Sequence, residues 1–243
     1  MSSASFPLIR PLAVPVEHGA WGFLLEPMIL GLLIAPSASG VLIGIGSIAV
    51  FLLRQPAKLA LHDWRHSSYP RTAVCEALVA IYTFTAIVAF GATFSRALVP
   101  LLFAIPFGAV QFLLDYRKQN RSLTAELCGA ITPAAVIASI VLASGKPIAI
   151  AAALSVVVLG RSIPAVLFVR SVLRGESRAV MLAAHTMAIA IAAFVSWAVV
   201  IAMSLLFARA IPLTSGIRAQ TIGKREIGWG ICFVVLTAAG AYI

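Results

Sequence analysis

Long apolar runs dominate this chain, and they fix the solvent in which it must fold. Between charged or Pro/Gly/Ser breaks, about eight runs have the length of a membrane helix. A hydrocarbon core of roughly 30 Å needs about 20 apolar residues per helix, whereas the strands of a membrane barrel would give short alternating segments. The predicted spans are 18–36, 39–62, 72–94, 97–116, 123–144, 147–170, 180–207 and 226–243.

Composition excludes a soluble protein. Hydrophobic residues make up 61% of the 243 residues and charged residues 11%, whereas soluble domains have about 25% charged residues. The sequence therefore predicts an all-α, polytopic transmembrane helical bundle that forms a single integral membrane domain over residues 1–243. Pro7, Pro11 and Pro15 interrupt the first apolar stretch, so we expect no cleaved signal peptide.

Lys and Arg are distributed unevenly among the connections. The connections after the second, fourth and sixth predicted spans are basic, and those after the first, third and fifth are short and nearly neutral. By the positive-inside rule, the N-terminus and the basic connections face the cytoplasm. We thus predict a multi-pass protein of the bacterial cell (inner) membrane. The net charge of +10 reflects basic rims that attract anionic membrane lipids, and we expect no nucleic-acid partner.

One segment conflicts with this pattern. Residues 208–225 carry four cations, although with eight crossings this connection should face the outside. Either the last span is not a full crossing, or the run 180–207 contains a re-entrant piece, or these late charges do not override the topology that the earlier connections set. We expect eight crossings.

The first group of candidate site residues lies in "LLRQPAKLALHDW", at the end of the second span. In a helix with about 100° per residue, Arg54, Lys58, His62 and Arg65 fall within about 80° and form one polar stripe, with Gln55 beside it. An isolated charge near the bilayer centre costs roughly 2.5 to 3.5 kcal/mol, so such cations reach an interface, face a polar cavity or bind an anion. Reaching the headgroups suits Arg65 better than the deeper Arg54.

The second group follows the fourth span, in "QFLLDYRKQNRSLTAELCGA". The expected partner of Asp115 is Arg117, Lys118 or a cation of another loop, and Arg121 belongs to the same basic connection. Thr124 is a plausible N-cap of the next helix, and Glu126 lies in the favourable first turn of that helix.

The third group lies in "LGRSIPAVLFVRSVLRGES". Arg170 and Arg174 are one turn apart on the same face, while Arg161 is more than two turns deeper, beside Pro164. Arg161 should face an internal polar cavity or form a salt bridge. Glu26 and His185 are candidate counter-ions for the deep cations, or members of a proton relay, and His18 near the N-terminus completes the set.

Two resemblances follow from these residues. "PVEHGAWGFLLEPMILG", the Arg-x-Pro element at Arg54 and Pro56, and "RSIPAVLFVRSVLRGES" resemble the YwiC-like family of bacterial membrane proteins. That resemblance implies a multi-span inner-membrane protein and names no reaction.

The arrangement is also similar to that of UbiA-type intramembrane prenyltransferases, helical bundles with a cytoplasm-facing cavity and Asp-rich motifs at the ends of helices two and six. Those motifs fall here on Arg54, Gln55, Lys58 and His62, and on Arg170 and Arg174. The aspartates that would hold magnesium are absent, so we predict no metal and no cofactor. The cations would instead contact a phosphate or carboxylate directly.

Three functions remain open. In the first, a cytoplasm-facing cationic cavity, with Arg54, Lys58, Arg161 and Arg170 around it, binds an anionic lipid or isoprenoid-type ligand, or processes it as a metal-independent prenyltransferase-like enzyme. The second is a transporter of a small organic anion, and the third is a non-catalytic membrane accessory or assembly protein. The candidate ligand-binding residues are Arg54, Gln55, Lys58, His62, Arg161, Arg170, Arg174, Asp115, Arg121, Glu26 and His18.

Overall fold

A computed structural model describes residues 9–14, 18–66, 71–212 and 218–240 of the chain, and all regular structure in these residues is helical. The helices are α1 (Ile9–Ala13), α2 (His18–Ile34), α3 (Ala38–His66), α4 (Thr72–Gly91), η1 (Arg96–Leu98), α5 (Val99–Tyr116), α6 (Leu123–Ala143), α7 (Ile148–Arg174), α8 (Arg178–Ala192), α9 (Trp197–Ala210) and α10 (Ala219–Gly240).

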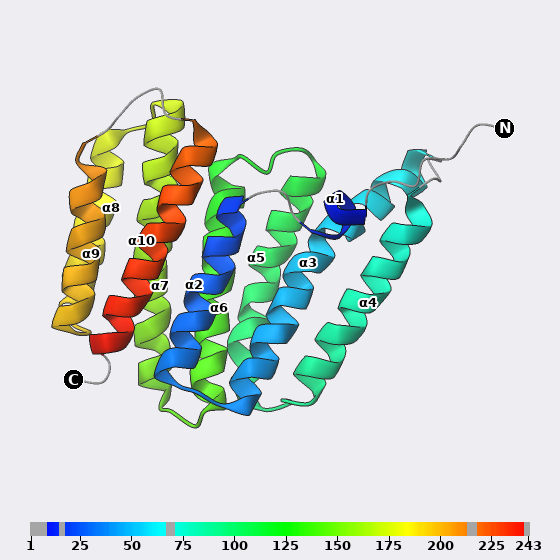
Figure 1. The fold of residues 1–243 in the computed structure, drawn as a ribbon, viewed down its shortest axis with the longest axis horizontal. Helices are drawn as coiled ribbons and strands as arrows, with labels where there is room; N and C mark the ends of the chain where they lie inside the picture. Colours follow the sequence, from blue (N-terminus) through cyan, green and yellow to red (C-terminus); the bar gives the residue numbers. More distant parts are fainter. Residues whose placement is uncertain (1–8, 15–17, 67–70, 213–217, 241–243) are drawn as a thin grey trace.

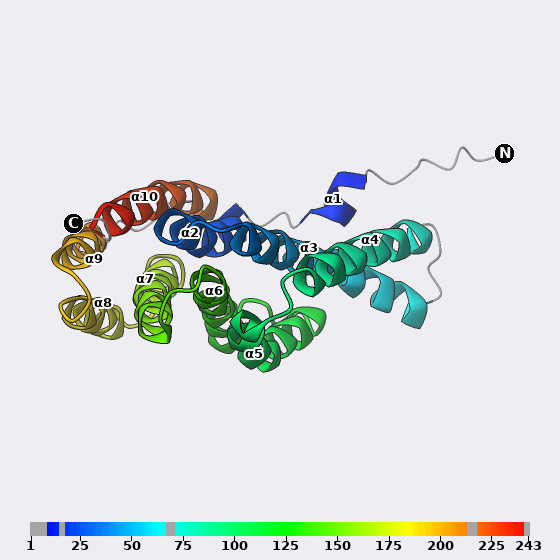
Figure 2. The ribbon, with the colours of Figure 1, turned by 90° about the horizontal axis from the view of Figure 1, so that it is seen from below.

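The helices from α2 to α10 run side by side (Figure 1). Seen from one end, they form two rows (Figure 2). One row contains α10, α2, α3 and α4, the other contains α8, α7, α6 and α5, and α9 joins the rows at one edge. Across the rows, α6 packs against both α2 and α3. The main apolar core lies among α2 and α6 to α10, and includes Leu30, Ile137, Val157, Met203 and Phe233.

The lengths and surfaces of the helices match a lipid environment. Five described helical segments are long and apolar enough to cross a membrane, and three shorter apolar helices accompany them. Large hydrophobic side chains also point outward, such as Phe84 on α4 and Phe103 on α5, which are 69% and 73% exposed. Such exposure suits contact with lipid tails rather than with water. The structure is that of a multi-pass helical membrane protein.

The predicted span 180–207 is two helices. After α8 the chain turns at residues 193–196, and the Ser196 side chain accepts a hydrogen bond from the Val199 backbone N–H to cap α9. No Gly or Pro marks this turn, so the apolar run reads as continuous in the sequence. The only local signal is a serine before an apolar segment, which is a common N-cap pattern.

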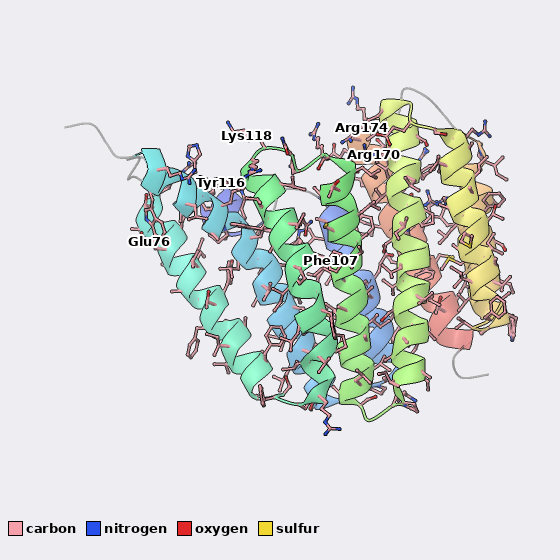
Figure 3. The ribbon with its side chains drawn as sticks, turned by 180° about the vertical axis from the view of Figure 1, so that it is seen from behind. Glu76, Phe107, Tyr116, Lys118, Arg170 and Arg174 are labelled. Carbon is pink, nitrogen blue, oxygen red and sulfur yellow. The ribbon has the colours of Figure 1, made fainter. Side chains whose placement is uncertain are left out.

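This turn removes the conflict in the charge pattern. Because α8 and α9 run in opposite directions, α9 ends and α10 begins at the same end of the bundle as the basic connections after α3, α5 and α7 (Figure 1). We call this end the basic end. Figure 3 shows Lys118, Arg170 and Arg174 there. Among the described connections, Arg96 and Lys146 lie at the opposite end.

Local signals place the helix ends that carry the site. Ser122, rather than the expected Thr124, caps α6, because its side chain accepts from the Ala125 backbone N–H at 3.3 Å. Glu126 lies in the first turn, as predicted. Gly175 ends α7 with φ of 68°, a left-handed conformation that strongly favours glycine.

Candidate functional site

Three clusters of ion pairs occupy the basic end and the adjoining interior. The first, which we call the α3–α5 cluster, consists of Arg54, Lys58 and Asp115. Lys58 Nζ lies 3.0 and 3.2 Å from the two carboxylate oxygens of Asp115, and Arg54 Nε lies 3.5 Å from one of them. The Asp115 side chain is 5% exposed, and the two cations are partly exposed. Two cations therefore contact the same buried acid.

The rest of the predicted stripe on α3 divides between different neighbours. Arg65 lies over the Tyr116 ring, with 5.6 Å between the guanidinium carbon and the ring centroid. His62 Nδ1 lies 3.7 Å from Asp63 Oδ1, and Gln55 is within 3.5 Å of the Pro11 carbonyl oxygen. The stripe therefore lines the contact with α5 at Arg54, Lys58 and Arg65, while His62 and Gln55 face other groups.

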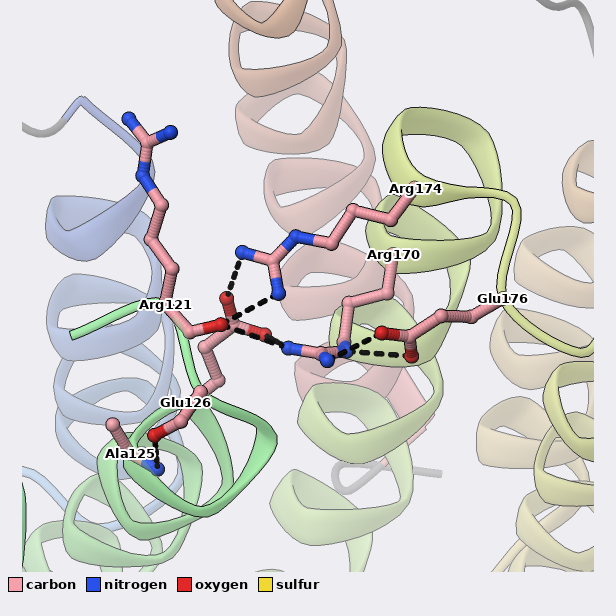
Figure 4. Close-up of polar contacts among 7 residues, drawn as sticks. Arg121, Ala125, Glu126, Arg170, Arg174 and Glu176 are labelled. Atoms are coloured by element: carbon pink, nitrogen blue, oxygen red, sulfur yellow. Dashed lines mark hydrogen bonds and ion pairs between the residues drawn. The ribbon is translucent and has the colours of Figure 1, made fainter. Parts of the chain in front are cut away.

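The second cluster, the α6–α7 cluster, joins Arg170 and Arg174 to Glu126 and Glu176 (Figure 4). Arg170 donates to Glu176 Oε2 and Glu126 Oε2, both at 2.7 Å, and its Nη2 also contacts Glu176 Oε1. Arg174 donates to Glu126 Oε1 at 3.2 Å. Both arginines also donate to the Arg121 carbonyl oxygen, whereas the Arg121 guanidinium points away from the cluster.

Two cations and two acids balance the charge of the α6–α7 cluster. The hydrogen bonds from Arg170 lower the pKa of the partly exposed Glu176 carboxyl below its usual range, because they stabilise the ionised form. The cluster ties the start of α6 to the end of α7.

The third cluster, the central cluster, contains Arg161, Arg209, Glu26 and Glu226. Arg161 lies at the middle of α7 with only 4% of its side chain exposed, and Arg209 is 6% exposed. Arg209 lies 2.5 and 3.0 Å from the two carboxylate oxygens of Glu226. Arg161 lies 3.4 Å from both Glu226 Oε2 and Glu26 Oε2. Glu226 therefore bridges the two buried arginines, and Glu26 is the counter-ion that the sequence suggested for a deep cation.

Backbone packing gives Glu26 its place. A Cβ atom added at Gly230 of α10 would overlap the Glu26 carboxylate, and one added at Gly22 would lie 3.3 Å from it. The absence of a side chain at Gly230 lets the Glu26 side chain cross this surface of α10 toward Arg161.

The central cluster leaves several nitrogens without a hydrogen-bond acceptor. Three buried nitrogens in the described part of the chain make no hydrogen bond of good geometry: Arg161 Nε, Arg209 Nε and Arg209 Nη1. Arg161 Nε still lies within ion-pair distance of Glu26, and Arg209 Nη1 of Glu226, whereas Arg209 Nε has neither kind of contact. Unsatisfied buried donors are rare and costly, and they often mark a missing ligand or water. Arg209 also lies 4.3 Å from the centroid of the Phe168 ring.

A hollow of about 510 Å³ adjoins this cluster at the basic end. We call it the α7–α10 hollow. Its lining includes Phe168, Arg209, Ile222, Arg225, Glu226 and Trp229. A second hollow, of about 420 Å³, lies between α3 and α4 and is mainly apolar, with Trp64 donating to Glu76 at 2.8 Å on its rim.

A fourth contact holds the α3–α4 connection. Asp63, fully buried, accepts two hydrogen bonds from Arg71 at 2.7 and 2.8 Å. This bidentate pairing raises the pKa of the Arg71 guanidinium above its usual value.

The predicted site residues thus fall into separate clusters. Arg54, Lys58 and Asp115 meet, and so do Arg170 and Arg174, but α2 and α6 pack against each other between α3 and α7 (Figure 2). Arg161 pairs elsewhere, with Glu26. The His18 side chain lies outside the described part of the structure.

Sequence reasoning missed Arg209, Glu226 and Glu176 as site residues. Arg209 and Glu226 lie 17 positions apart on either side of the connection that conflicted with the eight-span topology. The charges of residues 208–225 were the available signal that this segment joins the basic end. Because the turn at residues 193–196 has no clear mark in the sequence, the segment was instead assigned to the opposite end.

The fold and these clusters define a class: a multi-pass helical membrane protein with paired charges buried inside one basic end. The model of the YwiC-like protein family matches residues 14–144, which is more than half of the 243 residues, and the chain belongs to that family. The match covers α2 to α6, and thus Glu26 and the α3–α5 cluster, whereas Arg161, Arg209 and Glu226 lie beyond it. Comparison with curated proteins and with solved structures gives no match.

Proposed function

We propose that this chain is a bacterial inner-membrane protein whose basic end faces the cytoplasm and binds an anionic lipid or isoprenoid-type ligand. The observation that carries this proposal is the surplus of cations at one end of the bundle. The chain has 18 Lys and Arg against 8 Asp and Glu, and six of those acids already hold cations in the clusters described above. The remaining cations attract external anions, each contributing about 1 kcal/mol near an anionic surface.

The α3–α5 cluster is the first place where such a ligand would bind. Lys58 and Arg54 both contact Asp115, and both cationic side chains are partly exposed at the basic end. A phosphate or carboxylate beside Arg54 and Lys58 would accept charge-assisted hydrogen bonds from both side chains without a metal. In the UbiA-like interpretation these residues take the place of a metal-held diphosphate site. A shared cavity with Arg170 is not part of our proposal, because Arg170 is already paired with two acids.

The number of crossings belongs to the same proposal. If α2 to α10 each cross the membrane, the chain makes nine crossings rather than eight, and α9 ends on the cytoplasmic side with the other basic connections.

Lipid retention tests the binding proposal. Protein purified in a mild nonionic detergent should retain anionic lipids in excess over zwitterionic ones, as measured by mass spectrometry of the extracted lipids. The double variant Arg54→Gln/Lys58→Gln should retain less anionic lipid. Arg96→Gln/Lys146→Gln is the matched control, because it removes the same two residue types at the opposite end. Equal retention by both double variants and the parent protein would refute the proposal.

A specific observation supports a second candidate, a transporter of a small organic anion. The central cluster places four charged groups inside the helical bundle, and charges at such depth commonly mark substrate or ion pathways. Anion flux into proteoliposomes above that of empty liposomes would favour this function. No flux of any tested anion above that of empty liposomes would dismiss it.

A further inference from the structure

We propose that the α7–α10 hollow binds a phosphate-bearing amphiphile, with the phosphate at Arg209 and Arg225 and the apolar tail against Phe168 and Trp229. This inference rests on the proposed function, and it names a site and a headgroup chemistry for it. The hollow of about 510 Å³ is within the usual range of roughly 300–1,000 Å³ for ligand sites.

Charge indicates an anion. The lining contains two arginines and one acid. Glu226 is shared between Arg209 and the deeper Arg161, so it does not fully satisfy Arg209. The exposed Arg225 makes no ion pair or hydrogen bond with any residue in the described ranges.

The unsatisfied Nε donor of Arg209 supports this inference independently. The Nε atom of Arg209 is buried without a hydrogen-bond acceptor in the described structure, while Nη1 and Nη2 contact the two carboxylate oxygens of Glu226. The guanidinium is also held against the Phe168 ring at 4.3 Å, which restricts its orientation. A planar guanidinium held this way suits two parallel hydrogen bonds to phosphate oxygens. A phosphate that enters the hollow would compete with Glu226 for Arg209.

The remaining walls select for an apolar body. Phe168, Ile222 and Trp229 line the hollow beside the arginines. A molecule with a phosphate at one end and a hydrocarbon tail would satisfy both kinds of wall, whereas free phosphate would leave the apolar walls uncovered.

Trp229 provides a reporter. We suggest titrating the full chain in nonionic detergent with farnesyl monophosphate and following tryptophan fluorescence, with Trp229→Phe to assign the signal to the hollow. Inorganic phosphate and farnesol, the headgroup and the tail alone, are the comparison probes. We expect farnesyl monophosphate to bind at least tenfold more tightly than either.

Arginine substitutions test the contacts. Arg209→Gln should weaken farnesyl monophosphate binding about tenfold or more, because a hydrogen bond to a charged group is lost. Arg225→Gln should weaken it several-fold, and since Arg225 is exposed and unpaired in the described structure, this variant should fold even if Arg209→Gln does not. Arg96→Gln, at the opposite end, is the control.

The outcomes separate this site from the broader proposal. Unchanged binding in Arg209→Gln and Arg225→Gln, combined with a loss in Arg54→Gln/Lys58→Gln, would overturn the α7–α10 site and leave the proposed function standing. Inorganic phosphate binding as tightly as farnesyl monophosphate would overturn the amphiphile. If farnesyl monophosphate does not bind and the purified protein retains no excess of anionic lipid, both proposals fail.

Discussion

Glu226 is the residue on which the central cluster depends, so Glu226→Gln is the most informative stability test. Glu226 is the only acid that contacts both Arg161 and Arg209 in the described structure, and these arginines are 4% and 6% exposed. The substitution removes a negative charge but keeps the shape of the side chain. It also places an amide NH₂, a hydrogen-bond donor, beside the guanidinium groups of Arg161 and Arg209, which have no acceptor atoms.

The expected cost follows from the two cations left behind. Removing one partner of a buried ion pair costs about 3–5 kcal/mol, because the remaining charge stays buried without compensation. At about 2–4 °C per kcal/mol for a chain of this size, the midpoint of thermal unfolding should fall by roughly 6–20 °C. The assay is thermal unfolding in a single detergent, followed by circular dichroism.

Two comparisons make the test decisive. Glu76→Gln removes an exposed acid whose hydrogen bond comes from the exposed Trp64, and should shift the midpoint by less than about 2 °C. The double variant Arg209→Gln/Glu226→Gln removes both members of one pair and should lose less stability than the sum of the single variants. If Glu226→Gln is no more harmful than Glu76→Gln, the charges of the central cluster do not depend on one another.

Three further predictions concern packing, topology and pH. Gly230→Ala should displace the Glu26 side chain and destabilise the protein in the same unfolding assay. Gly228→Ala is the control and should be neutral or slightly stabilising, because a Cβ there would meet nothing within 4 Å. Equal effects of the two substitutions would refute the close approach at Gly230. Residues 194 and 118 lie at opposite ends of the bundle. In a cysteine-free background, Phe194→Cys should therefore react with a membrane-impermeant maleimide added to intact cells, and Lys118→Cys should not. Labelling of both cysteines from outside would refute the nine-crossing topology. The pKa of the Glu176 carboxyl is lowered in the folded protein, so its pair with Arg170 stabilises the fold above the unfolded pKa of about 4.3, and this stabilisation is lost as pH falls below that value. Glu176→Gln should therefore flatten the pH dependence of the unfolding midpoint between about pH 3 and 6. An unchanged pH profile would show that this pair does not contribute to the pH dependence.

The sequence by itself determined the solvent, the helical class and most of the helices. Six of the eight predicted spans correspond to single helices with ends shifted by a few residues, because membrane hydrophobicity is a local property that each segment carries alone. The charge pattern likewise identified the basic end. The last two predicted spans were inaccurate. The span 226–243 begins well inside α10. The span 180–207 is two helices, because a turn that ends at the N-cap Ser196 interrupts an apolar run without changing its composition.

Only the tertiary structure decided which charges meet. Arg54, Arg161 and Arg170 all looked like members of one cationic group, because a linear pattern shows the face of a helix but not its neighbour. Packing of α2 against α6 separates these three arginines. Each of them instead pairs with an acid from another helix: Arg54 with Asp115, Arg161 with Glu26 and Glu226, and Arg170 with Glu126. The cost of an unpaired charge in an apolar interior requires such a partner, but only the arrangement of helices in space determines which acid supplies it.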